Sequence, residues 1–289
     1  MLPVGLVLIM FSLGLGLTPA DFGRIVKRPK AFFVGALHQL IILPILAFNL
    51  ILVFEIDGEI AVGIMILAAC PGGAVSNIVS KFAGWDVALS ITLTATLSLL
   101  SMITVPLVMG IAINQFMGST APEINIISTV ITMFLFTVVP ITIGLILRIY
   151  WPLKIELIEP VFSKVAVTFF VIIIVGAIAT NWDLIVQNLV QVGLVLAVLI
   201  ILITFIAIYI PKKFGCSGKE AKTISVETSV QNAPLGLVVA SILVGGQEAM
   251  SLYAVPSAAY GVVWYLTMLP IALLMLIKRR NKKVNRSKS

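Results

Sequence analysis

The chain alternates long apolar stretches with short polar links along almost its whole length. A helix that crosses a bilayer needs about 20 mainly apolar residues, and stretches of this length recur. The pattern predicts nine membrane-spanning helices, at residues 2–17, 31–54, 60–80, 87–113, 124–147, 160–180, 184–210, 223–245 and 253–277. The first stretch has basic residues after it and none before it. Because this is the wrong order for a cleavable signal, we interpret it as a span.

The composition is that of an integral membrane protein. Of 289 residues, 60% are hydrophobic and 11% are charged, whereas soluble domains have roughly half and a quarter. Backbone polar groups inside a membrane must be satisfied within the protein, and a run of about 20 apolar residues does this as a helix. The chain is therefore predicted to be an all-α polytopic membrane protein.

Positive charge is confined to one side of the nine-span arrangement. Every Lys and Arg falls on one side, in alternate links, in the tail 278–289 or, for Lys164, just inside the span that follows such a link. The links on the other side carry the acidic residues Glu55, Asp57, Glu59, Glu123, Asp183 and Glu248. Since basic links face the cytoplasm, we expect the N-terminus outside and the C-terminus inside. The net charge of +7 then reflects topology and contact of the tail with anionic lipid, and nucleic acid is not an expected partner.

The third span is interrupted by polar and flexible residues at membrane depth. Pro71, Gly72 and Gly73 come in a row, and Ser76 and Asn77 follow. Proline lacks a backbone donor and glycine adds freedom, so the helix is expected to break here. Freed backbone groups at this depth must face other helices, water or ions, so the break indicates a cavity.

The fourth span carries a stripe of hydroxyl side chains. Ser90, Thr94, Ser98 and Ser101 follow one another at helical spacing and so share one face. They either line the cavity or bond to a neighbouring helix, a common use of Ser and Thr in membranes.

The eighth span contains a carboxylate, Glu227, followed by Gln231 and Asn232. A charged residue at this depth costs about 2.5 to 3.5 kcal/mol on insertion scales, and no predicted span contains a Lys or Arg near it. The compensating charge must therefore come from a proton or a bound cation.

The third and eighth spans also resemble each other. AVSN (74–77) and SVQN (229–232) occupy similar places in spans of opposite direction. Two broken helices in oppositely oriented halves are typical of secondary transporters built from inverted repeats. We therefore expect the two breaks to cross near the middle of the membrane.

With these motifs, nearly the whole chain resembles the bile acid:sodium symporter family. The resemblance rests on GLTPADF (16–22), AVGIMILAACPGGAVSN (61–77), DVALS (86–90) and ETSVQN (227–232). It implies two sodium ions as coupling ions. The implied ligands of the first are Ser76, Asn77, Ser90, Thr94 and Glu227, and those of the second are Gln39, Glu227, Gln231 and the backbone carbonyls of Thr228 and Val230.

The resemblance also implies an architecture with two broken helices crossing in a core domain. The core would comprise residues 31–113 and 181–277, and a panel domain that moves against it would comprise residues 1–30 and 114–180. Bacterial family structures have ten spans, so the nine predicted here resemble the animal members.

The implied function is sodium-coupled symport of an organic anion by alternating access, in the inner (plasma) membrane. Bile acids and smaller carboxylates both remain open as substrates, because the last span reads VVWYL where bile-acid-binding relatives commonly have His-Asn after Trp. The expected substrate-binding residues are Ala74, Val75, Asn232, Tyr265 and Leu266.

Other classes of protein fit the sequence less well. An intramembrane enzyme would need paired aspartates, a metal cluster or a nucleophile with a base, and the chain has a single His, at position 38. An arsenite-type exporter would need a second soft ligand beside Cys70. A channel or sensor built on the same cavity remains open, as does the oligomeric state. We expect no catalytic residue and no cofactor apart from sodium.

Overall fold

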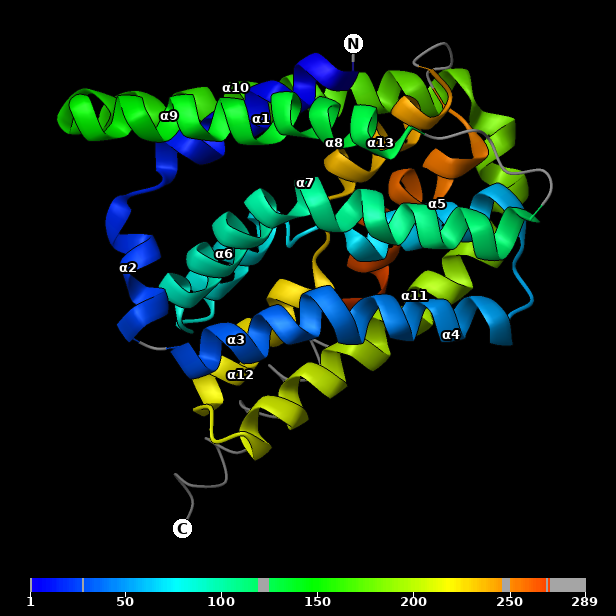
Figure 1. The fold of residues 1–289 in the computed structure, drawn as a ribbon, viewed down its shortest axis with the longest axis horizontal. Helices are drawn as coiled ribbons and strands as arrows, with labels where there is room; N and C mark the ends of the chain where they lie inside the picture. The colour runs from blue at the N-terminus through cyan, green and yellow to red at the C-terminus, as the bar shows by residue number, and fades with distance from the viewer. Residues whose placement is uncertain (1, 28, 119–124, 246–249, 269, 271–289) are drawn as a thin grey trace, which may run out of the picture.

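The computed structural model describes residues 2–27, 29–118, 125–245, 250–268 and 270, and its regular elements there are helices. Figure 1 shows two layers of helices. The upper layer contains α1 (Leu2–Gly16), α8 (Ile126–Met133), the π-helical turn η3 (Phe134–Val138), α9 (Val139–Tyr150) and α10 (Pro152–Thr180).

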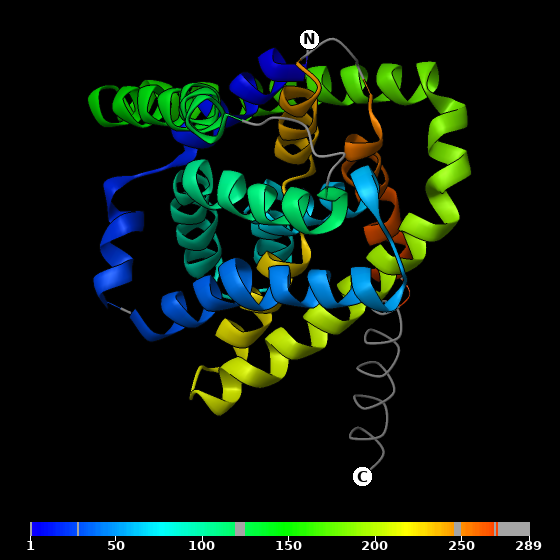
Figure 2. The same ribbon diagram turned by 45° about the vertical axis from the view of Figure 1, so that its right-hand side comes forward.

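The other layer contains the remaining long helices and four half-helices. Its elements are α3 (Pro29–Leu37), η1 (His38–Ile42), α4 (Leu43–Val53), α5 (Gly58–Ala69), α6 (Ala74–Phe82), α7 (Val87–Met117), α11 (Trp182–Lys213), α12 (Gly218–Ser229), α13 (Ala233–Leu243), η4 (Leu252–Ala254) and a helix over residues 255–268. Figure 2 shows the same separation of the layers from a second direction, with α10 and α11 joining them at one end.

Five helical stretches of the described residues are long and apolar enough to cross a membrane, and all five agree with predicted spans. They are Pro29–Val53, Val87–Met117, Ile126–Tyr150, Pro152–Thr180 and Trp182–Lys213. The helix that contains the predicted span 160–180 begins at Pro152, eight residues earlier than predicted. The charged residues Lys154, Glu156 and Glu159 interrupt the apolar run, but they do not end the helix. The chain is thus a helical membrane protein, and the count of nine spans remains a prediction.

Both predicted breaks are present, and the two unwound segments cross. The backbone nitrogen of Gly73 donates to the carbonyl oxygen of Val230 at 2.8 Å, and that of Asn232 donates to the carbonyl oxygen of Pro71 at 2.9 Å. Gly72 and Gln231 form an antiparallel bridge between these bonds. The breaks therefore satisfy each other's backbone groups, which makes unwound chain tolerable inside a membrane.

Short helix α2 (Pro19–Lys27) connects the two layers and is fastened to α7. The nitrogen and hydroxyl of Thr18 both donate to the Asp21 carboxylate at 2.8 Å, and the Thr92 hydroxyl donates to the Asp21 carbonyl at 2.9 Å. α1 instead packs tightly on α9, because a Cβ atom at Gly14 would overlap the backbone of Ile141. The chain therefore passes from one layer to the other in the link between α1 and α2.

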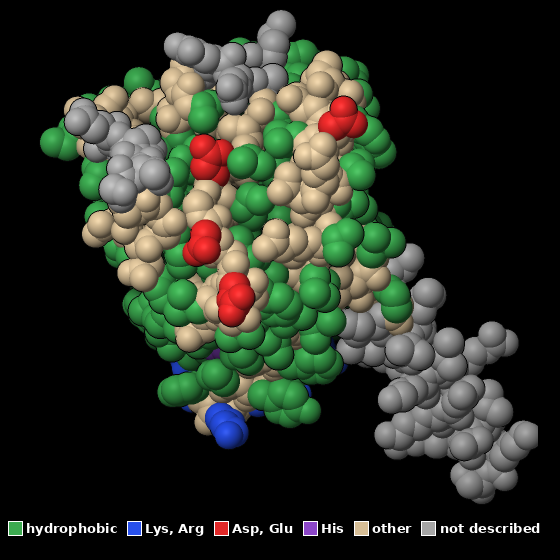
Figure 3. Space-filling model, turned by 90° about the vertical axis from the view of Figure 1, so that its right-hand side faces the viewer, with side chains coloured by type: hydrophobic (Ala, Val, Ile, Leu, Met, Phe, Trp, Pro, Cys, Tyr) green, Lys and Arg blue, Asp and Glu red, His purple; other side chains and the backbone are tan. Residues whose placement is uncertain are grey.

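The links at one end of the helices carry acidic side chains and no Lys or Arg. Figure 3 shows the face on the right of Figure 1, with acidic side chains spread over it. Its described acidic residues lie in the link between α4 and α5 and at the start of α5 and α11, and are Glu55, Asp57, Glu59 and Asp183. Glu123 and Glu248 lie outside the described residues. The basic links between α9 and α10 and between α11 and α12 lie at the opposite end (Figure 1).

This separation predicts which positions reagents reach from outside the cell. In a background with Cys70 and Cys216 replaced by Ala, Asp57→Cys should react with a membrane-impermeant maleimide on intact cells. Lys219→Cys should react only after permeabilisation, because its link carries the positive charge that stays in the cytoplasm. Labelling of both positions from the same side would contradict the predicted number of spans between them.

Candidate functional site

Glu227 lies where the two breaks cross. Its side chain comes from α12 and is 1% exposed. The hydroxyls of Ser76 and Ser90 donate to its Oε2 at 2.6 and 2.7 Å, and the hydroxyl of Thr94 donates to its Oε1. Three helices that are distant in sequence, α6, α7 and α12, therefore meet at one carboxylate.

The oxygen atoms around Glu227 outnumber the protons available to bond them. The Ser76 hydroxyl also lies 2.8 Å from the carbonyl oxygen of Gly73, and the Thr94 hydroxyl lies 3.0 Å from that of Ser90 and 3.4 Å from Oδ1 of Asn77. Each hydroxyl has a single proton to donate, so it cannot serve all of these acceptors at once. A cation placed among these oxygens would use the lone pairs that the protons leave unmatched.

No basic side chain among the described residues pairs with Glu227. A buried charge without a partner is strongly unfavourable. The carboxylate also packs directly against the first break, because a Cβ at Gly72 would overlap its Oε1. Glycine at position 72 has no side chain and therefore leaves space for the Glu227 carboxylate.

A second group of oxygens surrounds Gln39, which lies on the π-helical turn η1. Its Nε2 donates to the carbonyl of Cys70 at 2.6 Å and to Oε1 of Gln231 at 2.8 Å, and Nε2 of Gln231 donates to the carbonyl of Thr228 at 2.6 Å. Oε1 of Gln39 is buried, with no hydrogen-bond partner among the described residues. The carbonyl of Val230 already accepts the bond from Gly73 and has one lone pair left.

The donor set of both groups suits a hard monovalent cation. Hydroxyl, amide, carboxylate and carbonyl oxygens are the ligands that such ions prefer. Among the described residues no group of three or more His, Cys, Asp or Glu could hold a metal. His38, beside Gln39, instead forms a 2.7 Å hydrogen bond through Nδ1 with the carbonyl of Val34.

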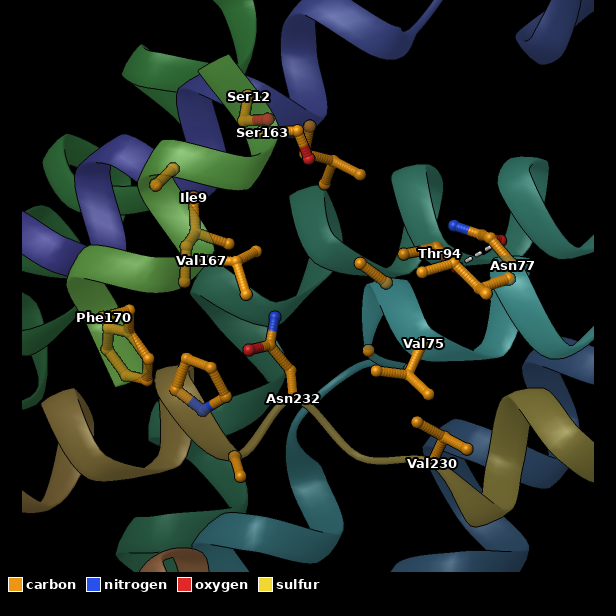
Figure 4. A pocket seen from close by; sticks show the side chains of 18 of the residues that line it. Ile9, Ser12, Val75, Asn77, Thr94, Ser163, Val167, Phe170, Val230 and Asn232 are labelled. Atoms are coloured by element: carbon orange, nitrogen blue, oxygen red, sulfur yellow. Dashed lines mark hydrogen bonds between the residues drawn. The ribbon is translucent and has the colours of Figure 1, made fainter. Parts of the chain in front are cut away.

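A cavity of about 600 Å³ lies between the two layers and reaches this crossing. Its walls are mostly apolar, and Figure 4 shows Ile9, Val167 and Phe170 of α1 and α10 on one side and Val75 and Val230 on the other. Of the residues predicted to bind substrate, Ala74, Val75, Asn232 and Tyr265 line this cavity, and their role in binding stays a prediction. Leu266 lies outside this lining, and its side chain is 70% exposed.

The cavity presents backbone and amide donors at the crossing. The N-cap of α6, Gly73, has no side-chain cap, so the amides of Ala74 and Val75 are left for a ligand. The side chain of Asn232 caps α13 through its oxygen, which accepts from the nitrogen of Leu235 at 3.1 Å. Its amide nitrogen therefore points toward the cavity (Figure 4). Such a concentration of N–H groups attracts an anion.

Among the polar residues of the cavity wall that were not predicted from the sequence, three lie on α1 and α10. They are Ser12 of α1 and Glu159 and Ser163 of α10. Glu159 falls one residue before the predicted span 160–180, and Ser163 follows it by four positions. That spacing places both on one helical face, and it becomes informative only when the helix is known to begin at Pro152.

The chain is similar to known transporters. Residues 3–188 match the family model described as the Sodium Bile acid symporter family. The uncharacterized sodium-dependent transporter YocS of Bacillus subtilis is 29% identical over 262 residues, which cover 89% of this chain and 77% of that protein. The human ileal sodium/bile acid cotransporter is 29% identical over 88% of this chain and 73% of its own length.

Plant relatives are similar to the same extent. The probable sodium/metabolite cotransporter BASS1 of Arabidopsis thaliana, a chloroplastic protein, is 29% identical over 90% of this chain. The aligned region covers 62% of the plant protein, so the chain spans less than two thirds of that relative's length.

Removing one hydroxyl from the cluster should weaken sodium binding specifically. In Ser76→Ala we expect sodium affinity to fall at least about tenfold, because a hydrogen bond or ligand to a charged group contributes about 1.5 to 3 kcal/mol. Ser80→Ala is the matched control, since Ser80 lies one turn further along α6, is equally buried, and has a hydroxyl without a partner among the described residues. Sodium titration of the melting temperature measures both. If Ser76→Ala bound sodium as tightly as Ser80→Ala and the wild type, Ser76 would be excluded as a ligand.

Proposed function

Since the chain belongs to the sodium bile acid symporter family, we propose that it couples the movement of an organic anion across the plasma membrane to sodium, by alternating access. Members of this family are transporters, and the chain is not an enzyme. The observation that carries the proposal is the buried Glu227 carboxylate, which is surrounded by hydroxyl oxygens and has no basic partner among the described residues.

Two sodium ions are assigned to the two oxygen groups. The first ion is bound by Ser76, Asn77, Ser90, Thr94 and Glu227, and the second by Gln39, Glu227, Gln231 and the carbonyls of Thr228 and Val230. The excess of acceptors around Ser76 and Thr94 supports the first site. The unpartnered Oε1 of Gln39 supports the second.

Sharing one carboxylate between two ions supplies a route to coupling. Two monovalent cations and one negative charge leave the crossing with a net positive charge, which attracts an anion to the adjacent amides of Ala74 and Val75. The coupling is reciprocal, so the substrate increases the affinity for sodium by the same factor by which sodium increases the affinity for the substrate. Sodium alone and the substrate alone each bind with lower affinity than they do together.

The arrangement of layers supports a core and a panel that move relative to each other. The core carries both crossing segments, and the panel contributes α1 and α10 to the cavity wall. The cavity lies toward the end at which α1 finishes and α10 begins, where the neighbouring links are basic. With the N-terminus outside, this end is cytoplasmic, and the conformation is inward-facing.

Transport into proteoliposomes tests the coupling. With an imposed sodium gradient, the wild-type protein should accumulate labelled taurocholate or butyrate above the external concentration. Glu227→Gln removes the shared charge, and we expect its accumulation to be at least about tenfold lower, since unpairing a buried charged site costs several kcal/mol. Asp183→Asn, an exposed acidic residue at the start of α11, should transport like the wild type.

Three outcomes would contradict the proposal in different ways. Uptake unchanged when choline replaces sodium would exclude sodium coupling. Equilibration of the anion without accumulation would indicate a channel. Wild-type accumulation by Glu227→Gln would show that the carboxylate has another role.

A further inference from the structure

The panel wall of the cavity carries a carboxylate that the proposed coupling does not use. Glu159 lies two turns into α10, and Ser163 follows on the same helical face, so both line the cavity. Ser12 of the adjacent α1 adds a second hydroxyl. Figure 4 shows Ser12 and Ser163 on the opposite side of the cavity from Val75 and Val230.

The Glu159 carboxylate has no neutralising partner among the residues whose side chains the structure describes. It has no hydrogen bond and no ion pair among the described residues, whereas Glu156, one turn earlier on α10, pairs with Arg148 at 3.7 Å. Position 16 of α1 is glycine, and even a Cβ added there would remain 3.9 Å from Oε1 of Glu159. The carboxylate is therefore partly exposed and available to whatever occupies the cavity.

The cavity consequently has two polar ends of opposite preference. The end at the crossing offers the amides of Ala74 and Val75 and the side-chain nitrogen of Asn232, which receive an anion. The panel end offers a carboxylate and two hydroxyls. The rest of the lining is mostly apolar, with Ile9, Val167 and Phe170 on the side of α1 and α10 and Val75 and Val230 on the side of the crossing.

We infer that Glu159 selects the chemical class of the substrate. The substrate is a monocarboxylate whose far end carries hydrogen-bond donors, either hydroxyl or ammonium groups, and an apolar middle separates the two ends. A second carboxylate at the far end is rejected, because two like charges repel in a cavity with apolar walls. This inference rests on the proposed function, since the anionic end is oriented by the sodium-loaded crossing.

A matched series of ligands separates these preferences. The probes are butyrate, 4-hydroxybutyrate, 4-aminobutyrate and succinate, with the corresponding eight-carbon set, so that the end group alone changes at each length. Binding is measured as ligand-induced thermal stabilisation of the full-length protein in saturating sodium. The variants are Glu159→Gln and the control Glu156→Gln, whose side chain is 70% exposed and outside the cavity lining.

In the wild type, the hydroxyl or ammonium member should bind more tightly than the methyl member of the same length, and the dicarboxylate most weakly. If the hydroxyl member binds more tightly, the donors of the natural substrate are hydroxyl groups. If the ammonium member binds more tightly, they are ammonium groups. Glu159→Gln should strengthen dicarboxylate binding and weaken ω-amino acid binding, each by about tenfold, the order expected for a charge pair that is partly exposed to water. The methyl member should change less than about threefold, and Glu156→Gln should match the wild type.

An unchanged ranking in Glu159→Gln would overturn the inference, and so would the failure of every probe to stabilise the wild type in sodium. Neither result touches sodium coupling, which stabilisation of the ligand-free protein by sodium tests separately. Equal binding of the probes in choline and in sodium would instead overturn the proposed function, whatever the ranking.

Discussion

The structure depends on the cost of holding a negative charge inside a membrane protein without a basic partner. Glu227 is almost fully buried, and the hydroxyls of Ser76 and Thr94 stabilise it only in part, because each has one proton and more than one acceptor. The rest of the site follows from this imbalance. The two helix breaks bring oxygen atoms to one point, and in the proposed mechanism a cation supplies the positive charge that the hydroxyl protons do not.

The breaks and the carboxylate reinforce each other. Unwound backbone would be costly at this depth if its groups had no partners, and here the segments around Gly73 and Val230 bond to each other. The same crossing leaves the first amides of α6 without a cap. The oxygens proposed to bind cations and the N–H groups proposed to bind an anion thus come from one backbone feature, so the proposed coupling acts over a short distance.

The sequence was informative wherever a residue carries a high free-energy cost at its predicted depth in the membrane. Pro71 and the Gly pair predicted the first break, and Glu227 without a basic partner predicted a cation. The hydroxyl stripe of the fourth span was less decisive, because Ser90 and Thr94 reach Glu227 whereas Ser101 bonds to the carbonyl of Ser98 instead. Side-chain spacing along one helix gives the face, and only the packing of the other helices decides which members of that face are used.

The panel was the harder part to predict. Glu159 stood outside the apolar run that defined its span, and its position on the cavity wall depends on how α10 packs beside α1. Leu266 illustrates the converse, since it was chosen by its place in a motif, and its side chain is exposed and is not part of the cavity lining. Contacts between layers are set by tertiary packing, which hydropathy along one chain does not encode.

The most direct test of the central claim is an anomalous diffraction map of crystals in which thallium(I), a heavy monovalent cation, replaces sodium. The account predicts a peak among the oxygens of Glu227, Ser76 and Thr94 that excess sodium removes. A map with no cation density beside the carboxylate would contradict it.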